Sequence, residues 1–254
     1  MIFDSHAHYD DEAFNEDRDI VLKELKENNI IGVLNCGASP EGARASVKLS
    51  KENDFFYAAV GLHPEYADKL DEKMLEEFKE LAKYEKVRAI GEIGLDYFHE
   101  QNPKSEIQKK AFRAQMQLAK ELCLPVVIHD RDAHEDTLII LKEFPEVIGV
   151  IHCFSGSVEF ARECLKIGYY IGVTGVVTFK NAKKIIDVVR EVPINKLLVE
   201  TDCPYMAPVP YRGKRNRSEY ISNIIETISS IRGISPKEVE NCTIENIKEL
   251  LKLK

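Results

Sequence analysis

Residues 1–11 read MIFDSHAHYDD, a short apolar run that ends in two histidines flanked by acids. Side chains alternate between the two faces of a β-strand, so His6 and His8 point the same way if this run is a strand. On an exposed edge strand the two imidazoles would only be surface polar groups. On a buried strand end they are well placed to share one divalent ion. The rest of the sequence has to decide between these two alternatives.

The opening run is the first member of a repeating strand–helix pattern. Most of the apolar runs are apolar at every position, as in strands buried on both faces of a parallel sheet. These runs are residues 1–7, 30–36, 55–63, 87–95, 124–130, 147–153, 169–175 and 197–203. Helical patterns cover residues 38–53, 71–85, 105–123, 158–168, 182–192 and 221–233. A capping box at Ser235–Glu238 predicts one more helix near the end of the chain.

This alternation predicts an α/β fold. About eight such units in a chain of this length favour a (β/α)8 TIM barrel. The alternative, a doubly wound open sheet, usually carries a glycine-rich phosphate turn after its first strand. Here that strand runs into SHAHYDD, which has no glycine, so residues 1–11 favour the barrel. No linker rich in Pro, Gly or Ser divides the chain, and we expect one barrel domain over residues 1–254 with C-terminal helices.

Composition restricts the class of partner. The chain has 35 Lys plus Arg against 43 Asp plus Glu, a formal net charge of −8. That balance disfavours a long nonspecific grip on duplex DNA and leaves room for a local basic patch. Six cysteines are scattered without a C-x-x-C pair, which indicates reduced thiols. Without a basic signal region or an apolar stretch of about 20 residues, we expect a cytoplasmic protein that avoids membranes and is a monomer or weak oligomer.

Metal-binding side chains recur at the carboxyl ends of the predicted strands, where a TIM barrel has its active site. The residues at these ends are His6, His8, His63, Glu92, His129, His152 and Asp202. A carboxylate at the end of an apolar strand is costly to desolvate unless a cation pairs with it. This pattern favours the metal site over the surface alternative. Leaving His63 aside, four imidazoles and two carboxylates are too many for one catalytic ion, so a two-metal site with a bridging carboxylate fits better.

Seven motifs, in order along residues 2–217, resemble the TatD-type metal-dependent deoxyribonucleases of the amidohydrolase superfamily. They are FDSHAH, GLHPE, GEIGLDY, VIHDRDA, IHCFSG, ETDCPYMAP and RGKRN. The resemblance implies a metal-dependent hydrolase that cleaves phosphodiester bonds of DNA by a metal-activated water.

The resemblance also implies roles for individual residues. The implied metal ligands are His6, His8, Glu92, His129, His152 and Asp202. His6 and His8 would bind the first ion with Asp202, and His129 and His152 would bind the second. Glu92 would bridge the ions, and Asp202 would also accept a proton from the attacking water. The two divalent ions stay open among Mg, Mn, Zn, Fe and Co, because mixed His and carboxylate ligands suit all of them.

Phosphate recognition is the second part of the prediction. The resemblance implies that His63, in its GxHP turn, contacts the substrate phosphate. Arg131 is a candidate second contact or only a surface charge. Residues 212–217, RGKRNR, are more basic than the family pattern. We expect Arg212, Lys214 and Arg215 to hold a nucleic-acid backbone, with a solvated loop as the alternative.

The expected substrate is a short single-stranded DNA end, because the acidic remainder of the chain disfavours wrapping a duplex. The aromatic residues that flank the predicted site, as base-stacking or packing groups, are Tyr97, Phe98, Tyr205 and Tyr211. Cys153 and Cys203 adjoin ligands, and we expect them to point away from the cluster as packing residues.

We therefore predict a 3′-end exonuclease acting on single strands, with DNA versus RNA and exo- versus endonucleolytic cleavage left open. Two alternatives remain. One is a metal-dependent hydrolase of a small amide, lactone or ester, or of aminoacyl-tRNA esters, because fold and metals do not fix the substrate. The other is a barrel that binds a partner without catalysis.

Overall fold

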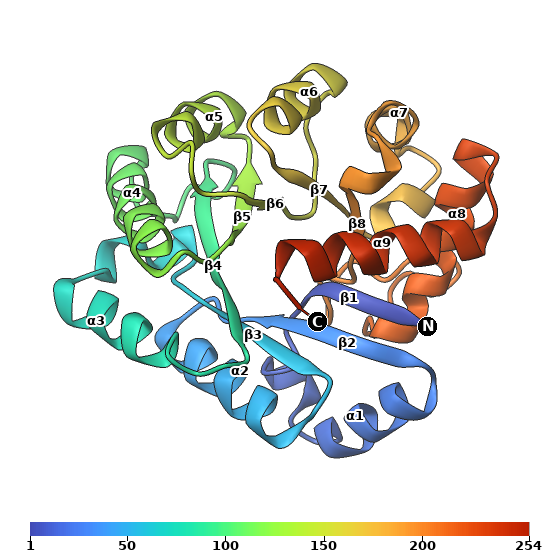
Figure 1. The fold of residues 1–254 in the computed structure, drawn as a ribbon, viewed down its shortest axis with the longest axis horizontal. Coiled ribbons are helices and arrows are strands. Elements are labelled where there is room, and N and C mark those ends of the chain that lie inside the picture. The colour runs from blue at the N-terminus through green and yellow to red at the C-terminus, as the bar shows by residue number, and fades with distance from the viewer. Residues whose placement is uncertain (254) are drawn as a thin grey trace.

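The computed structural model describes residues 1–253, and within them eight parallel strands follow one another around a barrel (Figure 1). The strands are β1 (Ile2–Ala7), β2 (Ile30–Cys36), β3 (Phe56–Val60), β4 (Val87–Asp96), β5 (Val126–Arg131), β6 (Gly149–Ile151), β7 (Tyr170–Val173) and β8 (Leu197–Val199). Each strand pairs with the next in parallel. A bridge between Ala7 and Cys203 joins the first strand to the segment after the last. The nearly closed barrel confirms the predicted (β/α)8 class over the open sheet.

Helices form the outer layer of the barrel (Figure 1). The α-helices are α1 (Arg18–Glu27), α2 (Pro40–Glu52), α3 (Glu72–Leu81), α4 (Ser105–Leu122), α5 (His134–Glu143), α6 (Val158–Lys166), α7 (Lys183–Glu191), α8 (Ile221–Arg232) and α9 (Pro236–Leu250). Short 3-10 helices are η1 (Glu12–Phe14), η2 (Pro64–Lys69), η3 (Gly175–Thr178), η4 (Ile194–Lys196) and η5 (Ser218–Tyr220). None of the helices in residues 1–253 is long and apolar enough to cross a membrane.

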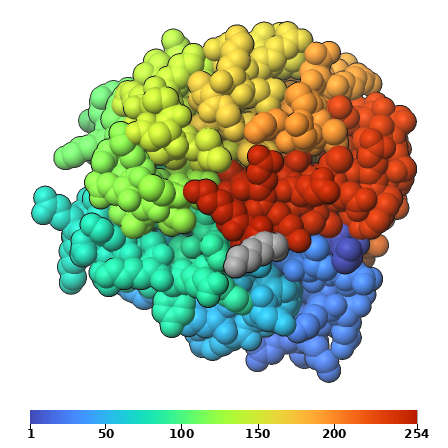
Figure 2. All heavy atoms as spheres, in the orientation of Figure 1, coloured from blue at the N-terminus to red at the C-terminus, as the bar shows by residue number. Residues whose placement is uncertain are grey.

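Helix α9 closes the amino-terminal end of the barrel. One apolar cluster combines buried residues from every strand with residues of α9 and Leu251, which directly follows it. Its strand members include Phe3, Leu34, Ala59, Ala89, Val127, Val150, Tyr170 and Leu198, and its C-terminal members are Ile244, Ile247, Leu250 and Leu251. Figure 2 shows the C-terminal helices lying across this face. The active site therefore lies at the opposite end of the barrel, where the carboxyl ends of the strands meet.

The predicted helix starts agree with the structure. The Ser39 hydroxyl accepts a hydrogen bond from the Gly42 amide at 3.1 Å, just before α2. Ser235 accepts from the Glu238 amide at 3.1 Å, just before α9. Both caps give an amide of the first helical turn a side-chain acceptor. Helix α1 has no counterpart among the predicted helices, and β8 ends at Val199, well before the end of its predicted run.

Candidate metal centre and catalytic cavity

The first candidate ion site joins the two histidines of the opening stretch with two distant carboxylates. The Nε2 atoms of His6 and His8 lie 3.0 Å apart and face each other. Glu92 Oε2 lies 3.5 Å from each of these nitrogens. Asp202 Oδ1 lies 3.6 Å from His6 Nε2 and 3.5 Å from His8 Nε2. Four donor atoms from β1, the turn after it, β4 and the segment after β8 therefore surround one point.

These separations fit a shared divalent ion. Tetrahedral coordination with ligand bonds of about 2.1 Å places the donor atoms about 3.4 Å apart. The five donor–donor distances given above lie between 3.0 and 3.6 Å. His8 Nδ1 lies 2.8 Å from the Cys36 carbonyl oxygen, which can only accept, so Nδ1 donates to it and Nε2 is the nitrogen available to an ion. The residues present thus suit a metal ion.

The second candidate ion site lies on the other oxygen of the same glutamate. Glu92 Oε1 lies 2.8 Å from His129 Nδ1 and 2.8 Å from His152 Nε2. Those two nitrogens are 3.4 Å apart. Glu92 therefore turns one oxygen to each group of histidines, which is the arrangement of a carboxylate that bridges two ions. All six predicted ligands come together in this way.

Two acidic residues that the sequence argument did not single out orient the second group. His129 Nε2 lies 3.1 Å from Asp96 Oδ2, so a proton on Nε2 is donated to Asp96 and Nδ1 is left as a ligand. Asp96 is itself held by the amides of Phe98 and His99. Glu200 Oε1 faces His152 Nδ1 at 3.7 Å. Such outer carboxylates set the tautomer and the ring orientation of histidine ligands. Asp96 ends the GEIGLD run and Glu200 lies in ETD. Their positions at strand ends could have identified both residues from the sequence.

The cluster keeps its carboxylates ionised. Burial alone would raise the pKa of Glu92, yet the neighbouring His152 and His6 hold it well below its usual range. Burial likewise opposes ionisation of Asp202, and the neighbouring His8, His152 and His6 keep its pKa below the usual value. Burial lowers the pKa of His6, which favours the neutral imidazole that binds metal.

A cavity of about 1040 Å³ opens above the cluster. His63 lines it and is half-buried, and its Nδ1 accepts from the Glu65 amide at 3.3 Å. Burial, reinforced by His129, lowers the pKa of His63 to about 3, so the ring is neutral with its proton on Nε2. That nitrogen lies 3.8 Å from Glu92 Oε1, at the edge of the cluster. Arg131 also lines the cavity, with its guanidinium 4.0 Å from the centre of the exposed Phe98 ring.

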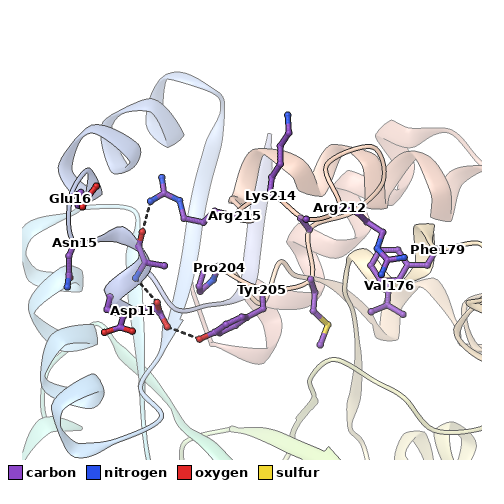
Figure 3. A pocket seen from close by; sticks show the side chains of 15 residues that line it. Asp11, Asn15, Glu16, Val176, Phe179, Pro204, Tyr205, Arg212, Lys214 and Arg215 are labelled. Atoms are coloured by element: carbon purple, nitrogen blue, oxygen red, sulfur yellow. Dashed lines mark hydrogen bonds between the residues drawn. The ribbon is translucent and has the colours of Figure 1, made fainter.

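The basic loop at 212–217 borders a second cavity of about 1170 Å³ (Figure 3). Arg215 is tied to the Asp17 carboxylate by two contacts and to the Ala13 carbonyl oxygen. Arg212 stacks on Phe179 at 4.1 Å, and Lys214 extends from the loop. The loop therefore overhangs the catalytic face, with Arg215 engaged in holding it there.

The four flanking aromatic residues differ in their availability. Tyr211 is stacked face to face on Tyr220, with ring centres 3.9 Å apart. Tyr97 donates its hydroxyl to Asp136. Phe98 and Tyr205 are 53% and 56% exposed and remain accessible to a ligand.

One expectation about the cysteines is wrong. Cys203 is fully buried in a packing cluster, as expected. Cys153 instead lines the catalytic cavity, with its sulfur 3.7 Å from Thr174 Oγ1. Its φ of 43° turns the backbone at this point, where a strand pattern cannot be extrapolated. Burial raises the pKa of the Cys153 thiol to about 12, which leaves it protonated and a poor nucleophile.

Known proteins are similar to this chain in sequence and in fold along its whole length. The family model described as TatD related DNase matches residues 3–252. The uncharacterized metal-dependent hydrolase YabD of Bacillus subtilis (strain 168) is 44% identical, over 100% of both chains. The 3'-5' ssDNA/RNA exonuclease TatD of Erwinia billingiae (strain Eb661) is 33% identical over 99% of both chains. The crystal structure of YjjV, a TatD homologue from Escherichia coli K12, has a TM-score of 0.92 and 31% identity, covering 100% of this chain and 98% of its own. This chain therefore belongs to the TatD family of metal-dependent hydrolases.

Proposed function

We propose that the protein is a metal-dependent deoxyribonuclease that releases nucleotides from the 3′ end of single-stranded DNA. The observation that carries the proposal is the position of Glu92, whose two oxygens face two separate groups of ligands. Paired ions at such a site suit the displacement at a phosphodiester, in which an attacking and a leaving oxygen both need charge stabilisation. The name of the Erwinia relative, a 3'-5' ssDNA/RNA exonuclease, supports the same substrate class.

The ligands of the cluster divide the work. When bound, two divalent ions lower the pKa of a water molecule and neutralise charge on the phosphoryl oxygens. Asp202 lines the cavity as an ionised carboxylate and takes the proton of the attacking water. Glu92 holds the two groups of histidines at a fixed separation, so the reacting atoms meet a preorganised site.

His63 and Arg131 hold the reacting phosphate. The neutral His63 ring presents Nε2–H at the edge of the cluster, where it donates to a phosphoryl oxygen. Arg131 offers a fixed positive fork at the rim, oriented by its stacking on Phe98. Both groups are donors that suit an anionic phosphoryl oxygen, and the charge of Arg131 favours a phosphate over a small neutral amide.

The test is a substrate comparison with the metal-loaded enzyme. We would offer 5′-labelled single-stranded DNA, the same strand in a blunt duplex, an RNA of the same sequence and an aminoacyl ester of tRNA, each with Mg²⁺ or Mn²⁺. The proposal expects the single-stranded DNA to shorten stepwise from its 3′ end and the duplex to resist. Rapid hydrolysis of the aminoacyl ester with no shortening of any strand would overturn it.

A further inference from the structure

Unpaired cations line the side of the catalytic face that follows β7 and β8. Lys183 and Lys184 begin α7 and line the catalytic cavity. Arg212 and Lys214 lie on the loop after β8 and line the neighbouring cavity. Within residues 1–253 none of these four side chains takes part in an ion pair. Solvated cations gathered at the mouth of a catalytic cavity attract an anionic ligand.

The other two cations of the basic loop have a different use. Arg215 pairs with Asp17, and Arg217 pairs with Glu24 and Glu219. These ion pairs hold the loop against α1, the residue before it and η5. Arg212 and Lys214 make no such ion pair in the described part of the chain, so they can bind a ligand while the loop stays in position.

The loop after β8 and the segment before α7 form one surface. The Val209 amide donates to Thr178 Oγ1 at 2.8 Å. A Cβ on Gly175 would lie 2.3 Å from the Met206 carbonyl oxygen, so the two backbones touch. Phe179 contacts both segments. Its carbonyl oxygen accepts a hydrogen bond from the Ala182 amide at 3.0 Å, just before Lys183, and the Arg212 guanidinium stacks on its ring. We call Phe179, Lys183, Lys184, Arg212 and Lys214 the β7–β8 shelf.

The shelf is continuous with the metal centre. The two cavities share Asp11, Val176, Tyr205 and Met206 in their walls. Tyr205 and Met206 are 56% and 36% exposed and line both cavities, so they lie between the shelf and the cluster. Helix α7 also begins without a side-chain cap, which leaves its first amides open to an anion.

The wall opposite the shelf carries the other sign of charge. Asp11, Glu12 and Glu16, after β1, line the second cavity. Asp11 and Glu16 lie across from Arg212 (Figure 3). One phosphodiester backbone can follow the shelf and avoid these acids. A duplex brings a second backbone about one groove width away, where the acidic wall repels it.

We propose that the β7–β8 shelf binds the backbone of single-stranded nucleic acid outside the reacting nucleotide, with Tyr205 and Met206 beneath its bases. This inference rests on the proposed nuclease function and adds the path of the strand. Lys183, Lys184 and Phe179 thereby become part of the substrate site, on the opposite side of the cavity from His63.

The test compares a shelf variant with a matched control. Lys183→Ala/Lys184→Ala removes two shelf cations, and Lys73→Ala/Lys110→Ala removes two exposed lysines of α3 and α4 that have no ion-pair partner within residues 1–253. Steady-state kinetics would use the metal-loaded enzyme on single-stranded DNA of about 15 nucleotides and on a dinucleotide, across a range of salt concentrations.

The shelf variant should raise KM for the long strand on the order of tenfold near 0.1 M salt, because each lost phosphate contact removes about 0.7 from the slope of log affinity against log salt. The slope should fall by about 1.4 for the two lysines. Lys183→Arg/Lys184→Arg should restore both values, and the control should match the wild type. The dinucleotide KM should rise much less than the KM of the long strand.

Two results would overturn the inference. One is a shelf variant whose KM and salt slope equal those of the control. The other is an equal rise in KM for the dinucleotide and the long strand, which would place the lysines at the reacting nucleotide. A wild-type enzyme that cleaves neither DNA would instead refute the nuclease function itself, so the two failures are distinguishable.

Discussion

The two oxygens of Glu92 set the chemistry of the site at the scale of single residues. One faces His6 and His8, and the other faces His129 and His152. Burying a carboxylate among four imidazoles is costly, because the charge loses its hydration. An apolar side chain at this position would stabilise the fold more. We propose that the value of Glu92 lies in holding two cations at one place.

Asp96 should control the second ion through His129. Asp96→Asn removes the negative charge that keeps the His129 proton on Nε2, so affinity for one of the two ions should fall about 10- to 100-fold. Metal titration followed by elemental analysis measures this. Asp68→Asn changes an exposed acid of η2 and should leave both affinities unaltered. Equal affinities in the Asp96 variant and the wild type would remove Asp96 from the account.

His63 should act on phosphate rather than on metal. His63→Ala removes one hydrogen bond to a charged oxygen, so kcat/KM for single-stranded DNA should fall about 10- to 100-fold. Metal content should stay at the wild-type level, because the His63 ring lies 3.8 Å from Glu92 while the ligand nitrogens approach to 2.8 Å. Loss of an ion from the variant would make His63 a ligand instead.

At the scale of elements, the ends of strands carry the predictive signal. His129 lies within β5 and His152 directly follows β6, where the apolar runs end, so both could be placed from sequence. Asp202 lies three residues beyond β8, in left-handed backbone with φ of 56°. Its amide donates to the His6 carbonyl oxygen at 3.0 Å. This turn brings the Asp202 carboxylate back over the barrel. The hydrophobic periodicity of the sequence does not predict such a turn.

The cap of α9 should affect stability without affecting catalysis. Ser235→Ala removes the side-chain acceptor of the Glu238 amide, so the free energy of unfolding should fall by about 1 kcal/mol in urea titration. The activity should not change, because α9 covers the amino-terminal end of the barrel. Ser230→Ala, on the exposed side of α8, should change stability by less than about 0.5 kcal/mol. Reduced kcat in the Ser235 variant would contradict this separation of the two ends.

At the scale of the whole molecule, the fold class followed from the number and order of apolar runs. The absence of a glycine turn after β1 decided between barrel and open sheet, and the closed order of strands bears that out. Contacts between distant loops could not be predicted. The pairing of Arg215 with Asp17 joins segments 198 positions apart, and only the closed barrel brings the loop after β8 against the segment after β1.

Removal of metal should lower the stability of the whole barrel. The ligands come from β1, β4, β5 and the segments after β6 and β8, so ions that bind only the folded state stabilise all of it together. Each ion at 100 times its dissociation constant contributes about 2.7 kcal/mol. Calorimetry with and without chelator should show a lower Tm for the metal-free protein, while circular dichroism at 25 °C keeps its helical signal. An unchanged Tm would mean that the cluster holds no ion.

The most direct test of the two-metal account combines metal content with nucleotide release in the wild type and in Glu92→Ala. Elemental analysis would count the ions in each purified protein, and a 3′-labelled single-stranded DNA would report release with Mg²⁺ or Mn²⁺ added. We predict up to two ions per chain in the wild type, fewer in the variant, and loss of release in the variant. A variant that keeps its ions and still releases nucleotides would contradict the bridging role of Glu92 and the mechanism built on it.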